Sequence, residues 1–126
     1  MYDHPGCVFT DLTAVQRYLD GQHVEIVAGD ITRTCRRLEG EDLVLSFIDT
    51  DNYTSATAAL KIAADRTVPG GAIVFDHFTG TDRFRYTLGE RMAGQALLDD
   101  PRYFHLHGAG VFWRQPPAQL DGAADA

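Results

Sequence analysis

Apolar residues occur along the chain in short runs that stop abruptly at glycine or aspartate. The runs are rich in β-branched and aromatic residues and predict strands at residues 24–28, 43–48 and 72–75. The run 43–48 is almost continuously apolar, which is typical of a central strand covered on both faces of a parallel sheet. Two later runs, 103–107 and 111–114, flank Gly108-Ala109-Gly110 and predict an antiparallel hairpin.

Between these runs, apolar residues recur at helical spacing. The stretches with this spacing are 11–19, 31–38, 56–66 and 83–98, the last through Phe84, Leu88, Met92 and Ala96. Polar residues that could cap the first three helices are Thr10 or Asp11, Asp30, and Thr54 or Ser55. Alternation of strands and helices predicts an α/β fold whose mostly parallel sheet ends in an antiparallel hairpin.

Length and composition limit the possible classes of protein. The chain has 126 residues, 44% hydrophobic and 23% charged, which predicts one compact domain over residues 1–115 followed by a flexible Pro-containing tail at 116–126. The net charge of -7 argues against nucleic acid or an acidic membrane as partner. No signal-like or membrane-length apolar segment is present, so a cytoplasmic location is expected. Cys7 and Cys35 lack metal-type spacing and are expected to be free thiols.

Acidic residues follow each of the first three predicted strands. Ligands of parallel α/β sheets bind at the carboxyl ends of the strands, so these residues are expected at one edge. The segments concerned are Gly29-Asp30, Asp49-Thr50-Asp51 and Asp76-His77. Because neighbouring carboxylates repel one another, they predict a divalent cation held by Asp49 and Asp76, with Asp51 as base for a bound hydroxyl.

Less specific interpretations of the same residues stay open. Each aspartate could simply cap the following helix. His77 could be a metal ligand, a base, a substrate contact or a structural histidine, whereas His105 and His107 are expected to be a packed or exposed pair.

Two segments carry a resemblance to a known family. Residues 47–57, FIDTDNYTSAT, and 69–78, PGGAIVFDHF, resemble the macrocin O-methyltransferase (TylF) family of class I S-adenosylmethionine-dependent enzymes. The resemblance extends from residue 2 to about residue 114 and implies a Rossmann-like methyltransferase sheet. It also implies that Gly29 and Asp30 contact the cofactor adenine and that Asp3 binds its ribose.

The same resemblance implies roles at the acidic edge. Asp49 and Asp76 correspond to Mg2+ ligands, with Asp49 also at the cofactor, and Asp51 corresponds to the base that takes a proton from a sugar hydroxyl of a natural product, as in antibiotic biosynthesis. His77 stands where the family commonly has a second aspartate. Since an imidazole nitrogen is a poor ligand for Mg2+, another divalent cation is a candidate.

The resemblance also implies a missing part. The family's first strand and its glycine-rich turn for the methionine part of the cofactor have no counterpart here, so the fold is expected to be N-terminally incomplete. In the related strand order, 3-2-1-4-5-7-6, the missing strands lie between 24–28 and 43–48. Three outcomes are predicted: the reading frame begins upstream, another chain or copy supplies the strands, or 24–28 pairs directly beside 43–48. We therefore expect the carboxyl-terminal part of a methyltransferase, inactive alone.

Two other functions compete with this one. A haloacid dehalogenase-type phosphatase also uses an Asp-x-Asp, with the first Asp as nucleophile. That family, however, has Thr or Val four residues after the nucleophile, where this chain has Tyr53. It also requires a downstream lysine, and the sole lysine of this chain, Lys61, lies inside a predicted helix. The non-enzymatic alternative is an inactive methyltransferase-like subunit that binds a catalytic partner.

Overall fold

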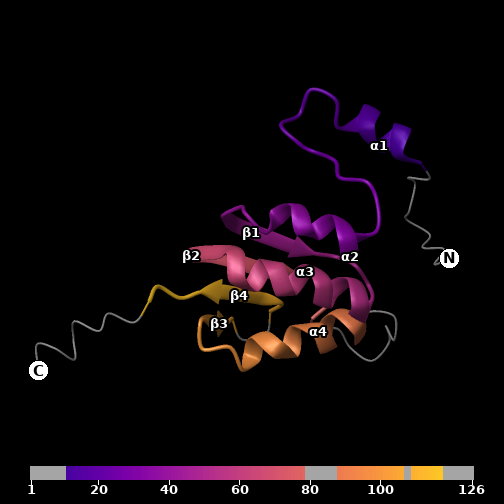
Figure 1. Ribbon diagram of the computed structural model, residues 1–126. Coiled ribbons are helices and arrows are strands. Elements are labelled where there is room, and N and C mark those ends of the chain that lie inside the picture. Colours follow the sequence, from indigo (N-terminus) through magenta and orange to yellow (C-terminus); the bar gives the residue numbers. More distant parts are fainter. Residues whose placement is uncertain (1–10, 79–87, 107–108, 118–126) are drawn as a thin grey trace, which may run out of the picture. The chain divides into compact units, whose positions relative to one another are not determined.

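The computed structural model describes residues 11–78, 88–106 and 109–117, which belong to two units, residues 1–30 and 31–126. In the first unit, α1 spans Leu12–Tyr18 (Figure 1). The Asp11 side chain caps it by accepting a hydrogen bond of 2.7 Å from the Ala14 N–H, and this confirms the predicted helix.

The strand predicted at 24–28 is wrong, because these residues are neither helix nor strand. A strand requires a hydrogen-bonded neighbour, and β-branched composition alone does not supply one. Pairing of this segment beside 43–48, one of the three predicted outcomes, is not observed among the residues that the structure describes.

The second unit contains the sheet and most of the helices. Its elements are α2 (Ile31–Thr34), the 3-10 helix η1 (Cys35–Leu38), β1 (Leu43–Ile48), α3 (Tyr53–Arg66), β2 (Thr67–Phe75), α4 (Leu88–Leu98), β3 (Tyr103–His105) and β4 (Val111–Arg114) (Figure 1). The predicted helix 31–38 is thus a short α-helix, α2, followed directly by the 3-10 helix η1.

Helix α3 begins earlier than predicted and is capped by a different residue. The extended Asn52 accepts a 2.8 Å hydrogen bond from the Ser55 N–H through its Oδ1, so a cap at Thr54 or Ser55 is wrong. At the other end the helix passes directly into β2, and the buried Thr67 hydroxyl donates to the Ala63 carbonyl at 2.6 Å.

The four strands form one sheet in the order β1-β2-β4-β3. The β1–β2 pair is parallel, whereas β2–β4 and β4–β3 are antiparallel, which confirms the α/β class and its closing hairpin. Gly71 permits the close approach of β2 to β1, because a Cβ there would lie 2.6 Å from the Val44 carbonyl oxygen.

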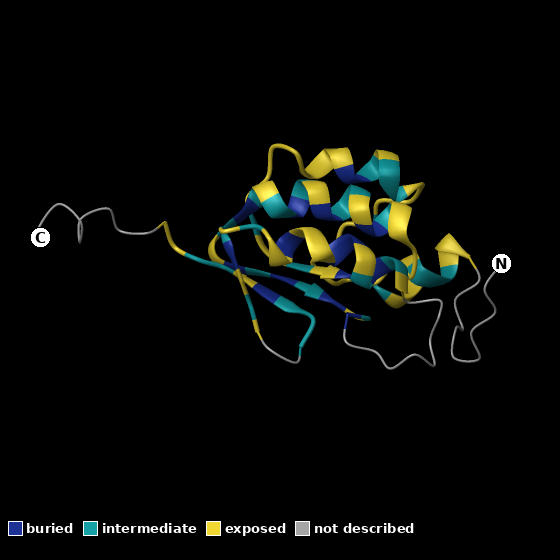
Figure 2. Ribbon diagram, turned by 90° about the horizontal axis from the view of Figure 1, so that it is seen from below, coloured by how far each residue is buried: buried dark blue, intermediate teal, exposed yellow. Residues whose placement is uncertain are grey.

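The core lies between this sheet and α3 and α4, which lie side by side along one face of it (Figures 1 and 2). Phe112 is fully buried and packs edge-on against Phe75 and Phe78. His105 stacks on Phe112 at 4.6 Å, and its Nε2 lies 2.7 Å from the Ala109 carbonyl oxygen, so it is a packed histidine. His107 lies outside the described residues.

The opposite face of the sheet is apolar but exposed. Leu45 and Phe47 of β1 are 66% and 61% exposed. The strand register places Ala72, Val74 and Trp113 on the same face. In the described part of the chain β1 is also the edge strand, so neither the predicted central position nor the predicted coverage of both faces is observed. The strands expected to be missing would pair with this edge, whereas the exposed face would have to be covered by elements packed on it.

The remaining predictions concern single features. Cys35 is buried and free, as expected, whereas Cys7 lies outside the described residues. Residues 118–126 also lie outside them, so the division into a domain at 1–115 and a tail at 116–126 stays a prediction. Among the described helices, none has the length and apolar character needed to span a bilayer.

Candidate active site

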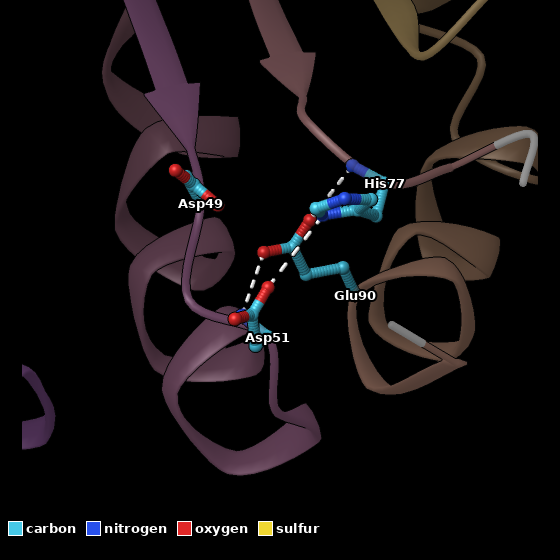
Figure 3. Close-up of side chains that lie close together, drawn as sticks. All are labelled: Asp49, Asp51, His77 and Glu90. Carbon is cyan, nitrogen blue, oxygen red and sulfur yellow. Dashed lines mark hydrogen bonds and ion pairs between the residues drawn. The ribbon is translucent and has the colours of Figure 1, made fainter. Parts of the chain in front are cut away.

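The carboxyl ends of β1 and β2 lie next to each other and bring the predicted acidic residues together. Asp49 and Asp51 follow β1, and His77 follows β2 (Figure 3). Asp76 precedes His77 in the same loop. The Asp76 N–H donates to the Ile48 carbonyl at 3.0 Å, so the parallel strand pairing continues to the edge of the site. The two loops are therefore aligned by the sheet itself.

Asp51 occupies an unusual backbone conformation. Its φ of 59° lies in the left-handed region, and it is the one non-glycine residue with positive φ among those described. The Asn52 side-chain amide donates to the Thr50 carbonyl at 3.0 Å across this turn. The turn fixes the position of the Asp51 carboxylate, which remains accessible beside His77.

His77 connects the two loops. Its Nδ1 lies 2.8 Å from Asp76 Oδ2 and 3.5 Å from Asp51 Oδ1, giving ion pairs when the imidazole is protonated. The atom is buried and makes no hydrogen bond of normal geometry within the described ranges. A buried nitrogen facing carboxylates without such a bond fits either a bound proton or a bound cation.

Burial and like charges both act on Asp49. Partial desolvation of the otherwise accessible Asp49 carboxyl raises its pKa, and the carboxylates of Asp76, Glu90 and Asp51 raise it further. Potential ligand atoms of Asp49, Asp51, His77 and Glu90 all lie within 4.8 Å of one another. Asp76 is not part of that set but contacts His77 directly.

The donor set fits a hard divalent cation. Carboxylate oxygens suit Mg2+ and Mn2+, and the imidazole nitrogen makes the set more favourable for Mn2+ than an all-oxygen site would be. A cation here would also offset the mutual repulsion that raises the pKa of Asp49.

Glu90 is a component that the sequence interpretation missed. It lies in the first turn of α4, is 0% exposed, and accepts hydrogen bonds from the backbone N–H groups of Thr50, Asp51 and His77. The predicted apolar face of this helix is wrong, since Leu88 and Met92 are exposed. The buried residues instead are Glu90, Ala93, Gly94 and Leu97. These four residues have the i, i+3, i+4, i+7 spacing of one helix face, and Glu90 is the first of them. This spacing was the sequence signal that could have placed Glu90 on the buried face.

Other predicted site residues are not brought to this cluster. Gly29, with φ of 135°, and Asp30 end the first unit, so the structure does not place them relative to the cluster. Asp3 lies outside the described residues. Their contacts with a cofactor therefore stay predictions.

Comparison with known proteins identifies the family. The model of the macrocin-O-methyltransferase (TylF) family matches residues 13–115. Among solved structures, the apo structure of CalS11, a TDP-rhamnose 3'-O-methyltransferase in calicheamicin biosynthesis, matches with a TM-score of 0.53 and 25% sequence identity. The match covers 70% of this chain and 39% of that chain, so this chain spans well under half of that enzyme. No protein of curated function matches. The matched residues include the strands and the acidic loops of the cluster, and the chain belongs to the macrocin-O-methyltransferase family.

Proposed function

We propose that the chain is an S-adenosylmethionine-dependent O-methyltransferase, or the carboxyl-terminal part of one, that methylates a sugar hydroxyl with the help of a divalent cation. The observation that carries the proposal is the cluster of Asp49, Asp51, Asp76 and His77 at the adjacent ends of two parallel strands, within a member of this family. The substrate named for CalS11, a TDP-linked rhamnose, supports a sugar acceptor from natural-product biosynthesis.

Asp49, Asp76 and His77 would hold the cation, and Asp51 would act as the base. When bound, a divalent cation lowers the pKa of a hydroxyl that coordinates it. The Asp51 carboxylate is accessible and lies 3.5 Å from His77 Nδ1, so it can accept the proton of a hydroxyl bound there. The acceptor oxygen then forms its bond to the methyl carbon as the carbon–sulfur bond breaks, and the electron pair remains on sulfur. Alignment of oxygen, methyl and sulfonium is the main requirement of this step.

The cofactor site requires more of the fold than the second unit provides. Asp49 lies at the cluster, whereas Gly29, Asp30 and Asp3 are proposed cofactor contacts outside that unit. The exposed edge of β1 and the apolar face carrying Leu45 and Phe47 support a further polypeptide segment that pairs with β1 and covers this face. An upstream segment, a second copy or another chain could supply it.

Two experiments test these proposals. In the gene product that contains this chain, Asp51→Asn should lower the rate of methyl transfer from S-adenosylmethionine to a TDP-deoxysugar by about 100-fold or more, as expected for a general base. Asp99→Asn, an exposed carboxylate just after α4, is the matched control. An unchanged rate in Asp51→Asn would contradict the assigned base.

The second experiment tests incompleteness. Calorimetric titration of the isolated chain with S-adenosylmethionine should show no tight binding, because the glycine-rich turn that the resemblance assigns to the methionine part of the cofactor has no counterpart in this chain. Tight binding would refute the expected inactivity of the isolated chain. An inactive partner subunit remains the alternative, and it predicts no methyl transfer by the whole gene product.

A further inference from the structure

We propose that Glu90 is a positioning residue that holds the loops after β1 and β2 at the separation the site requires. The inference rests on the function proposed above for those loops. It assigns to one buried carboxylate on α4 the task of orienting Asp51 and His77 toward each other.

The hydrogen bonds of Glu90 divide between the two loops. Its Oε1 accepts from the Thr50 and Asp51 N–H groups at 2.5 and 2.8 Å, and its Oε2 accepts from the His77 N–H at 3.0 Å. Figure 3 shows the bonds to Asp51 and His77. We call these three bonds the Glu90 bridge. Each oxygen serves one loop, so a single rigid carboxylate fixes the distance between them.

The same contacts argue against Glu90 as a metal ligand. The side chain is completely buried, and Oε1 already accepts two bonds, which matches its two lone pairs. Its negative charge is balanced by three backbone N–H dipoles, so it does not require a cation. The accessible carboxylates of Asp49, Asp51 and Asp76 are the better ligands.

The conformation of Asp51 depends on this bridge. A left-handed backbone is disfavoured for a residue with a Cβ, although aspartate tolerates it better than most. The bond from the Asp51 N–H to Glu90 fixes the peptide orientation of that turn. Loss of the bridge therefore releases the residue proposed as the base.

Gly89 allows Glu90 to reach the loops. A Cβ at Gly89 would lie 2.7 Å from the carbonyl carbon and 2.9 Å from the Cα of Asn52, and it would also meet the Tyr53 nitrogen. Only a residue without a side chain lets the start of α4 pack this closely against the start of α3.

The test uses Glu90→Gln, which keeps the size of the side chain but replaces one acceptor oxygen by a donor NH2. If the remaining oxygen of the glutamine keeps the bonds from Thr50 and Asp51, its NH2 group faces the His77 N–H. Both of these groups are donors, so the hydrogen bond to His77 is lost. In the metal-free chain, amide hydrogen exchange measured by NMR should be at least about tenfold faster at His77, with Thr50 and Asp51 still protected. Mn2+ affinity, measured by electron paramagnetic resonance, should fall about 10- to 100-fold, as for other residues that orient metal ligands.

Controls distinguish this role from the alternatives. Asp99→Asn removes an exposed carboxylate and should change neither measurement. Glu90→Ala should expose all three amides to exchange, and if it fails to fold, Glu90→Gln alone decides. Wild-type exchange at all three amides of metal-free Glu90→Gln, whether or not Mn2+ affinity falls, would overturn the proposal. A third outcome separates the two proposals. If Glu90→Gln shows the expected faster exchange at His77 but the wild type does not bind Mn2+, the bridge is supported and the proposed metal-assisted function is refuted.

Discussion

Gly89→Ala is the most informative single perturbation, because it adds one methyl group where α4 meets the loop before α3. The new carbon would lie 2.7 and 2.9 Å from two backbone atoms of Asn52. Carbon atoms normally approach to about 3.5–4.0 Å, so the helix must retreat by about 1 Å. The contact is with backbone atoms, which have no alternative rotamer to relieve it.

The expected loss of stability follows from two opposing effects. Overpacking of this kind costs about 1–3 kcal/mol. The better helix propensity of alanine offsets up to about 1 kcal/mol of that cost, and less in the first turn of a helix. The net loss of about 1–2 kcal/mol corresponds to a fall in melting temperature of about 5–15 °C for a unit of this size.

Thermal unfolding monitored by circular dichroism measures this loss, with Gly40→Ala as the control. Gly40 has no atom within 4 Å of an added Cβ, so its substitution should change the melting temperature little. Gly89→Ala should also accelerate amide exchange at His77, because Glu90 moves with the helix. Equal melting temperatures for the two variants would show that α4 does not pack against Asn52 as described.

Two further predictions concern charge and the core. Because the pKa of Asp49 is raised in the folded chain above its ordinary value of 3.8, its contribution to stability is greatest in acid and is lost as the pH rises through the folded pKa. Asp49→Asn should therefore stabilise the metal-free chain at neutral pH, by an amount that shrinks as the pH falls; urea unfolding across this range measures it, and a destabilised variant at neutral pH would contradict the sign. Phe112→Ala should lose about 3–5 kcal/mol in the same assay, because the ring is fully buried. Phe104→Ala, at a position 52% exposed, should lose far less, and equal losses would refute the placement of the core.

Local sequence patterns determined much of this fold. The apolar runs at β1 and β2 and the amphipathic stretch at α3 were predicted because strand and helix periodicity is a property of neighbouring residues. The meeting of Asp49, Asp51 and Asp76 was also predictable, since successive parallel strands end at the same edge. The family resemblance was carried by these same segments.

Features that depend on distant partners were decided only by the tertiary structure. The apolar run 24–28 has strand composition, but composition does not show whether a neighbouring strand exists. A cap at Asn52 rather than at Thr54 or Ser55 depended on which residue was extended before the helix began.

Glu90 is the clearest case of a residue whose role the tertiary structure alone reveals. It is the single glutamate of α4, and the other three glutamates of the chain, Glu25, Glu39 and Glu41, are all exposed. Burial of a charge is unfavourable unless hydrogen bonds compensate it. The three compensating N–H groups come from residues 40, 39 and 13 positions away in the sequence. Sequence periodicity reflects contacts between residues that are close in the sequence. The stabilisation of Glu90 by two remote loops could therefore be recognised only in the folded structure, where the sheet brings those loops together.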